Sequence, residues 1–228
     1  MKVKLYNITP KGLSLRQHHI FIGISLGTAK KLTKDQITNW INWGKLYTKG
    51  QIVFLIADEI ARFNYRVFSG YGETKSINRA FNEGLKYEKL IRDITMEKGI
   101  MRVGVIHWRD IWNNEKEKIR LVLTEEYCTN EKFRTNILFF VRKYVKNRGV
   151  DPDESQLDYL SQYILYELPT LMDGISYNRT KYSLLLYPIF GRSSGMSEFV
   201  VGLKKSFPNL NKKLTPYIQI PLVETNIE

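Results

Sequence analysis

The sequence is poor in the residues on which disulfide-bonded, metal-binding and membrane proteins depend. It has one cysteine, Cys128, which excludes an internal disulfide and a cysteine-based zinc site. Its longest apolar stretches are about the length of a strand, far short of the ~20 residues that a membrane-spanning helix needs. Residues 1–12 carry lysines but no apolar signal core. We therefore expect a cytoplasmic protein that binds no metal.

Features that divide a chain are absent as well. There is no linker rich in Pro, Gly and Ser, no repeat of fixed period and no low-complexity tract. With 228 residues, 43% of them hydrophobic, the chain can bury one substantial core. Residues 1–228 are therefore expected to form one domain. The sequence has no heptad seam, so this domain is expected to be a monomer.

Basic residues outnumber acidic residues. There are 35 Lys and Arg residues against 23 Asp and Glu, which gives a formal net charge of +12 and a pI near 9.6. This excess favours a polyanionic partner, and nucleic acid fits better than a membrane because neither terminus is a basic amphipathic segment. Many basic proteins bind no polyanion, so the arrangement of the charges matters more than their sum.

Histidine is scarce, and this limits how the most conspicuous motif can work. That motif is the apolar run Phe21–Gly27, in which Ser25 stands between Gly23 and Gly27. A short apolar run bounded by glycine predicts a buried strand that enters a tight turn, with Phe21, Gly23 and Ser25 on one face. A serine in that position can serve as a nucleophile, although most Gly-x-Ser-x-Gly strings are turns without chemistry.

A serine hydrolase is the first function that this motif suggests. The usual order of serine, acid and histidine requires a histidine after Ser25, and His107 alone meets that condition. Such a triad would leave the second half of the chain unused, and too few strands precede Ser25 for that fold. The number of histidines therefore disfavours a hydrolase, and Ser25 needs another means of activation.

Strand and helix patterns alternate along the chain. A capping box formed by Thr33 and Gln36 opens a helix, and the continuous apolar run Ile52–Asp58 is typical of a strand buried on both faces. Further strands are expected over residues 101–108 and 183–190, with helical patterns between them. This alternation predicts an α/β fold, a Rossmann-like parallel sheet flanked by helices.

A long helix, expected from about Thr74 to Ile94, separates its charges from its apolar residues. At about 100° per residue, one stripe of this helix is basic: Lys75, Arg79, Lys86 and Lys89. The opposite side is expected to pack: Ile77, Ala80, Phe81, Gly84 and Ile91. A stripe of one sign can follow a phosphate backbone, and a solvated helix face is the alternative. A weaker candidate for the same surface is a second basic group: Arg142, Lys143, Lys146 and Arg148.

The stretch that begins at Asp151 predicts a further helix. Asp151 is expected as its N-cap, with Pro152 in the first turn. One face of this helix carries three polar side chains: Tyr163, Glu167 and Thr170. Pro169 is expected to bend or end the helix near Glu167. A tyrosine hydroxyl beside a carboxylate can bind a substrate ammonium group and move protons, and a surface tyrosine touching a solvated glutamate is the alternative.

The last strand pattern covers residues 183–190 and places Leu185 and Tyr187 on one face. Because Pro188 cannot donate a hydrogen bond to a sheet, this strand is expected to end there or to lie at an edge. The chain beyond Asn209 is expected to be extended.

In their order and separation these segments resemble the cyclodipeptide synthases over most of the chain. The matching parts are residues 23–27, the basic helix with Arg79 and Gly84, residues 163–169, and Tyr187 near the end of a late strand. The resemblance implies a Rossmann-like domain similar to the catalytic domain of class I aminoacyl-tRNA synthetases. It also implies an enzyme that makes a cyclic dipeptide, a 2,5-diketopiperazine, from two aminoacyl-tRNAs by a ping-pong mechanism.

The resemblance also implies roles for individual residues. Ser25 would accept the first aminoacyl group as an ester, and Tyr187 would be required for the chemistry. Tyr163 and Glu167 would hold the substrate amino group and assist proton transfer, and the basic helix would lie against tRNA. Because aminoacyl-tRNA is already an activated ester, the missing histidine is tolerable. Five residues are expected to line the substrate pocket: Phe21, Gly23, Thr28, Thr170 and Leu185.

Two positions differ from the commoner pattern of the family. Thr28 stands where some members carry Asn, and Pro188 follows Tyr187 where they carry His, so the chain resembles the subfamily that lacks both. Stabilisation of an oxyanion would then fall to Thr28 or to backbone N–H groups at the start of the next helix. The sequence has no Walker loop and no His-x-Gly-His string, so neither ATP nor any other cofactor is expected.

The main rival interpretation is a tRNA-binding module without catalysis. It would share the basic helix, but it gives no reason for four residues to occur together: Ser25, Tyr163, Glu167 and Tyr187. Trapping of an aminoacyl group on Ser25 would separate the synthase from both this module and the hydrolase.

Overall fold

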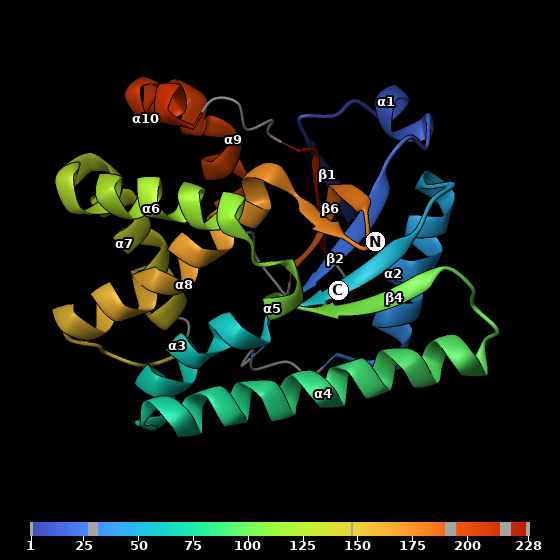
Figure 1. Ribbon diagram of the computed structural model, residues 1–228, viewed down its shortest axis with the longest axis horizontal. Helices are drawn as coiled ribbons and strands as arrows, with labels where there is room; N and C mark the ends of the chain where they lie inside the picture. Colours follow the sequence, from blue (N-terminus) through green and yellow to red (C-terminus); the bar gives the residue numbers. More distant parts are fainter. Residues whose placement is uncertain (1, 27–31, 147, 190–194, 215–219, 227–228) are drawn as a thin grey trace.

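The computed structural model describes residues 2–26, 32–146, 148–189, 195–214 and 220–226 (Figure 1). A seven-stranded sheet runs through its centre in the order β1-β7-β6-β2-β3-β4, with β5 paired to β6. The strands are β1 (Lys2–Tyr6), β2 (His19–Ile24), β3 (Ile52–Ile56), β4 (Val103–His107), β5 (Ile175–Tyr177), β6 (Thr180–Ile189) and β7 (Leu222–Asn226). Neighbouring strands from β7 to β4 are parallel, whereas β1 is antiparallel to β7 and β5 to β6. The predicted Rossmann-like α/β fold is confirmed.

Helices cover both faces of this sheet. They are α1 (Pro10–Ser14), α2 (Lys34–Tyr47), α3 (Asp58–Ser69), α4 (Glu73–Glu97), α5 (Trp108–Ile111), α6 (Asn114–Thr129), α7 (Glu131–Lys146), α8 (Glu154–Asp173), α9 (Met196–Ser206) and α10 (Pro208–Lys213). Apolar residues of α2 and α4 form one core with the sheet, and those of α6, α7, α8 and α9 form a second core on the other face (Figure 1). The central strands therefore have no solvated face.

The central strands are apolar throughout because both of their faces are buried. Side chains of β2 alternate between the two cores, with Phe21 on the α8 side and Ile22 on the side of α2 and α4. All five residues of β3 are buried, as expected of a parallel strand with helices on both faces. The capping box before α2 is confirmed, since Gln36 N donates to Thr33 Oγ1 at 3.2 Å.

The predicted N-cap of α8 was wrong. Its N-cap is Asp153, not Asp151: Gln156 N donates to Asp153 Oδ1 at 2.8 Å, and Gln156 Oε1 accepts from Asp153 N at 3.1 Å. Pro169 was expected to bend or end the helix; it does not end it, because α8 continues to Asp173, and a bend there stays a prediction. Proline deprives one carbonyl of its donor, but the last turn buries Leu171 and Met172 in the core and so remains helical.

The predictions for the late strand also need correction. β6 continues past Pro188 to Ile189 and is paired with β7 there, so it does not end at Pro188. In the sheet order β6 lies between β2 and β7, but at Pro188 its β2 side is unpaired and is locally an edge. Leu185 N donates to Pro221 O at the side of β7, and successive N–H groups alternate, so the nitrogen of Pro188 is on the side of β2. Pairing with β2 stops at Leu186, so no hydrogen bond is lost. The chain beyond Asn209 is not all extended, because α10 reaches Lys213 before β7 begins.

Candidate active site

Ser25 directly follows β2 at the carboxyl end of the parallel sheet, and it is exposed. Gly23, two residues earlier, has room beside it: a Cβ atom there would lie 3.9 Å from Leu185 Cδ1 of the neighbouring strand. In parallel α/β sheets the carboxyl ends of the strands are where ligands bind. The predicted strand therefore presents Ser25 where a substrate can reach it.

Helix α8 supplies the partners of Ser25. The Tyr163 hydroxyl lies 3.0 Å from Ser25 Oγ, although the two residues are 138 positions apart. One turn further along α8, Glu167 Oε1 accepts a long hydrogen bond of 3.5 Å from the Tyr187 hydroxyl of β6. These four residues, which the sequence analysis proposed as catalytic, line one cavity of about 130 Å³.

The cavity shifts the protonation of the groups that line it. Apolar and aromatic side chains form most of its lining, so the charged forms of the polar groups are poorly solvated. Burial raises the pKa of Glu167 to about 7, against a small lowering by the hydrogen bond from Tyr187. Burial and the nearby Glu167 carboxylate raise the pKa values of Tyr163 and Tyr187 well above the usual range. Near neutral pH both tyrosines therefore keep their protons, while Glu167 can take one up or release it.

Several residues of this cavity were not found from the sequence. Its remaining walls come from α3, α7, α8 and α9: Asn64, Phe140, Val141, Tyr144, Leu160, Ile164 and Met196. One signal was available, because Asn64 interrupts the apolar face of a short helix between Ile60 and Val67. The apolar residues of α7 and α9 carry no local mark, since they are typical of any buried helix face.

Four of the five residues predicted to line the substrate pocket do not line this cavity. Phe21, Thr170 and Leu185 are buried in the sheet and in α8, and they are not among the residues that line the cavity. Gly23 does not line it either. Thr28 is outside the described residues. A pocket role for these five residues therefore stays a prediction.

Histidine does not activate Ser25 in this arrangement. His107, which a serine-acid-histidine triad would require, places Nδ1 at 2.7 Å from Asp58 Oδ2 and Nε2 at 3.0 Å from Glu88 Oε2. Carboxylates accept hydrogen bonds, so both ring nitrogens donate, and the hydrogen bond to Asp58 raises the pKa of His107. A protonated imidazole held by two carboxylates cannot serve as the base for Ser25.

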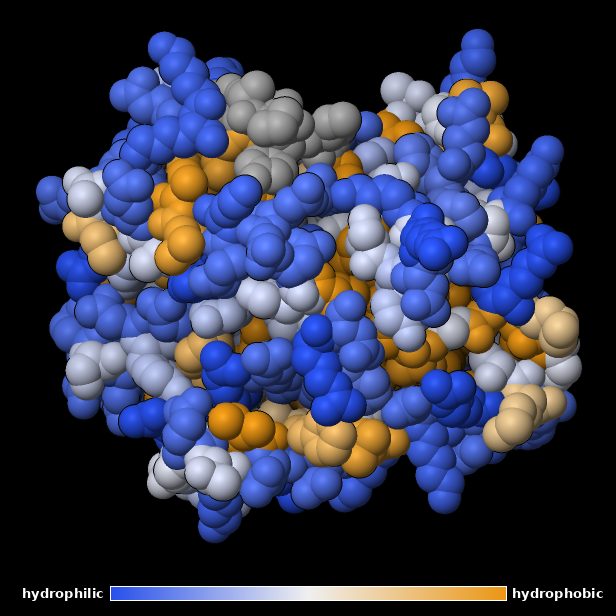
Figure 2. Space-filling view, viewed as in Figure 1, coloured by the Kyte–Doolittle hydropathy of each residue, from blue (hydrophilic) through white to orange (hydrophobic). Residues whose placement is uncertain are grey.

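Helix α4 presents the predicted basic stripe to solvent. All four of its members are exposed: Lys75, Arg79, Lys86 and Lys89. Ala80, Gly84 and Ile91 are buried as expected, but Ile77 is 41% exposed, and Ser76 is buried in its place. The helix faces α3 through positions 76, 80 and 84, which turns Ile77 outward, and apolar side chains interrupt the hydrophilic surface along α4 (Figure 2).

The second basic group is partly occupied by contacts within the protein. Arg142 forms an ion pair with Glu154 at 2.9 Å, and the Arg148 guanidinium lies 4.5 Å from the centre of the Tyr144 ring. In the α4 stripe Lys75 likewise lies 4.1 Å from the centre of the Tyr71 ring, but among the described residues none of the four members forms an ion pair. The ion pair of Arg142 therefore keeps the α4 stripe the stronger candidate for a phosphate backbone.

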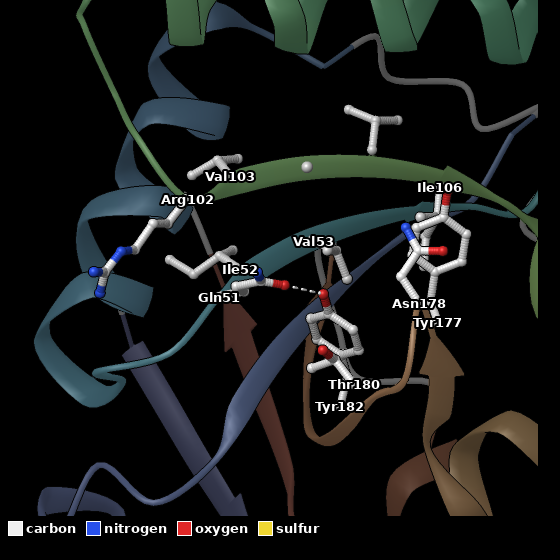
Figure 3. Close-up of a pocket in the computed structure, with 12 residues that line it drawn as sticks. Gln51, Ile52, Val53, Arg102, Val103, Ile106, Tyr177, Asn178, Thr180 and Tyr182 are labelled. Atoms are coloured by element: carbon white, nitrogen blue, oxygen red, sulfur yellow. Dashed lines mark hydrogen bonds between the residues drawn. The ribbon is translucent and has the colours of Figure 1, made fainter.

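A second, larger cavity of about 260 Å³ lies between β3, β4 and the β5–β6 turn (Figure 3). The Tyr182 hydroxyl crosses it to donate to Gln51 Oε1 at 2.7 Å (Figure 3). Its lining contains no serine, cysteine, histidine or carboxylate, and Arg102 is its one charged residue. Its hydroxyl groups therefore have no carboxylate or histidine beside them to activate them, so the smaller cavity is the candidate active site.

Two further searches cover the described part of the chain. Within it, no group of three His, Cys, Asp or Glu side chains is placed to hold a metal ion. None of its helices is both long enough and apolar enough to cross a membrane.

The fold and the site together define a class: a Rossmann-like protein with a serine at the carboxyl end of a central strand, beside two tyrosines and a glutamate. The family model described as cyclodipeptide synthase matches residues 10–202, and the chain belongs to this family. The protein is therefore an enzyme of the kind that forms cyclic dipeptides from aminoacyl-tRNAs. The resemblance seen in the sequence is confirmed, while its subfamily stays a prediction.

Solved structures agree with this fold. A cyclodipeptide synthase from Staphylococcus haemolyticus is 18% identical, with all of both chains covered and a TM-score of 0.70. A Mycobacterium tuberculosis protein, described as demonstrating that cyclodipeptide synthetases are related to type I tRNA synthetases, is 17% identical over 86% of this chain and 83% of its own, with a TM-score of 0.65. A cyclodipeptide synthase from Candidatus Glomeribacter gigasporarum, bound to Phe-tRNAPhe, is 17% identical over 92% and 88%, with a TM-score of 0.60. A search among curated proteins finds no match.

Proposed function

We propose that this enzyme makes a 2,5-diketopiperazine from two aminoacyl-tRNAs through an aminoacyl ester on Ser25. The observation that carries the proposal is the 3.0 Å contact between Ser25 Oγ and the Tyr163 hydroxyl in the cavity that Glu167 and Tyr187 also line. Membership of the family supports the substrates. The relative that was solved with Phe-tRNAPhe supports tRNA as the carrier of the amino acids.

In the first step, Ser25 Oγ attacks the ester carbonyl carbon of one aminoacyl-tRNA. The bond from this carbon to the ribose oxygen breaks, the ribose oxygen takes up the proton of the serine, and free tRNA leaves. Tyr163 is close enough to orient Ser25 Oγ and to pass this proton on. An ester is an activated acyl donor, so the step needs no histidine.

In the second step, the amine of the other aminoacyl-tRNA attacks the ester carbon on Ser25. Glu167 takes a proton from the attacking amine, because its pKa of about 7 leaves it ionised in part of the population. Ser25 Oγ leaves and is reprotonated, which gives a dipeptidyl-tRNA. The free amine of the first residue then attacks the remaining ester, closes the six-membered ring and releases the second tRNA.

Binding of tRNA is assigned to α4. The exposed stripe of Lys75, Arg79, Lys86 and Lys89 offers four cations along one face of a 25-residue helix. α4 packs against α3, which carries a residue of the cavity, so a tRNA acceptor end along α4 would lie near Ser25. Phosphate contacts of this kind position a substrate without reading its sequence.

The test is to express the protein in a bacterium beside its Ser25→Ala variant and to search both culture media for cyclic dipeptides by mass spectrometry. Diketopiperazine masses that depend on Ser25 are expected. The purified protein, mixed with aminoacyl-tRNA and quenched in acid, should gain the mass of one aminoacyl group on the peptide that contains Ser25. Full product formation by Ser25→Ala would exclude the covalent route, and tRNA binding without either product would favour the non-catalytic module.

A further inference from the structure

Asn64 is a polar residue on the buried side of α3. The residue is only 4% exposed, and it lines the same cavity as Ser25. Among the residues that the structure describes, no hydrogen bond to its amide is present. Buried polar groups almost always have a partner, and one without a partner destabilises the fold. Asn64 is not among the polar side chains whose atoms are closed off from solvent, so its amide is reached from the cavity, where water or a bound molecule supplies its partner.

The position of Asn64 follows from the fold. α3 begins at Asp58, two residues after β3 ends, and β3 is the parallel neighbour of β2. The helix therefore starts at the same edge of the sheet at which β2 presents Ser25. Its next residues, Ile60 and Phe63, pack in the core with α8. An apolar side chain would suit position 64 equally well if packing were its only task.

The other polar groups of the cavity are already hydrogen-bonded or cannot contact a substrate. The Tyr163 hydroxyl contacts Ser25, and the Tyr187 hydroxyl donates to Glu167. The Tyr144 hydroxyl has no partner in the described part of the chain either, but its oxygen is closed off from solvent. The Asn64 amide is thus the uncommitted donor among the described residues that line this cavity.

We propose that the Asn64 amide donates a hydrogen bond to the carbonyl oxygen of the aminoacyl group on Ser25 and so stabilises the oxyanion of the acyl transfers. This inference rests on the proposed function. When the nucleophile attacks, the electron pair of the carbonyl π bond moves to this oxygen, and it returns when the leaving oxygen departs. A fixed N–H donor in a small cavity stabilises that charge more than water does. Amide nitrogen suits the task because it stays neutral and does not form an ion pair with Glu167.

Two substitutions test the donor directly. Asn64→Ala removes the amide, and Asn64→Asp keeps its shape but offers acceptors in place of the N–H donors when ionised. Rapid-quench single-turnover acylation with aminoacyl-tRNA should be slowed about 100-fold in both variants, the cost of one lost oxyanion donor. The Kd for tRNA should not change, because Asn64 is inside the cavity and away from the α4 stripe.

The matched control is Asn114→Asp, which makes the same chemical change at the exposed first residue of α6. It is expected to acylate at the wild-type rate, and thermal melting confirms that all variants fold. Acylation at the wild-type rate by both Asn64 variants would overturn the inference. So would wild-type activity of Asn64→Asp alone, because a residue that binds the substrate ammonium group tolerates a carboxylate. A wild-type enzyme that forms no acyl-enzyme would overturn the proposed function as well.

Discussion

Glu167→Gln exchanges a carboxyl whose ionisation the fold opposes for an amide of nearly the same shape. Burial raises the pKa of Glu167 from 4.5 to about 7, and each pKa unit corresponds to about 1.4 kcal/mol. Ionising this carboxyl therefore costs about 3 to 4 kcal/mol more in the folded protein than in the unfolded chain. The glutamine can still accept the hydrogen bond from Tyr187, so the variant should be the more stable protein while losing the proposed base.

The sign of the pH dependence follows from the direction of the shift. A folded-state pKa above the unfolded one means that the wild type loses stability as the pH rises from about 4.5 to about 7, after which the loss is complete. The advantage of Glu167→Gln should therefore be about 1 kcal/mol at pH 5 and about 3 kcal/mol at pH 8. For a domain of this size, the melting temperatures should separate by roughly 5–10 °C more at pH 8 than at pH 5.

Urea unfolding of both proteins between pH 5 and pH 8 measures this difference, because the contributions of all other groups cancel. Glu97→Gln is the matched control: its side chain is 62% exposed and pairs only with Lys34 within the described residues, so its effect should stay within about 0.5 kcal/mol at every pH. If Glu167→Gln gains nothing between pH 5 and pH 8, the pKa of Glu167 is not raised. The assignment of this residue as a base near neutral pH would then fail.

Two further predictions concern α4 and α8. Replacing Lys75, Arg79, Lys86 and Lys89 together by Ala should weaken tRNA binding. The slope of log K against log salt concentration should fall by about 3 to 4, because each lost phosphate contact removes roughly 0.7–0.9. An unchanged slope in filter binding would show that the stripe is only a solvated helix face. Thr170→Val should raise the free energy of unfolding by about 1 kcal/mol, because the buried Thr170 hydroxyl has no hydrogen-bond partner in the described part of the chain. A destabilised Thr170→Val protein in urea unfolding would show that this hydroxyl does have a partner.

Much of the site was predictable because its signals are local. The strand before Ser25 is marked by an apolar run between glycines, and the shared face of Tyr163 and Glu167 follows from their spacing of four along a helix. The order of strands and helices then placed the carboxyl end of β2 near α8, as in other parallel sheets. Local pattern and fold class marked these residues one by one, and the resemblance to the cyclodipeptide synthases was needed to assign them to one site.

The other predictions failed where two local signals compete for the same role, or where the structure of a segment depends on tertiary packing alone. Asp151 and Asp153 both suit an N-cap, and the structure uses the one that Gln156 can complete as a capping box. Pro169 stays helical because the turn after it is buried, which its sequence does not reveal. The walls supplied by α7 and α9 meet Ser25 only after the chain has folded, so their apolar residues could not be told from ordinary core.

The arrangement around Ser25 also restricts the acyl donors that the proposed reaction can use. Both nitrogens of His107 are held by Asp58 and Glu88, which leaves the Tyr163 hydroxyl as the described contact of Ser25 Oγ. Because the pKa of Tyr163 is well above its usual range, it holds its proton and cannot deprotonate the serine in advance. A neutral serine is a weak nucleophile, sufficient for an ester but not for a peptide bond. In this site, the absence of a histidine base therefore favours aminoacyl-tRNA and protects the amide bonds of the product from attack.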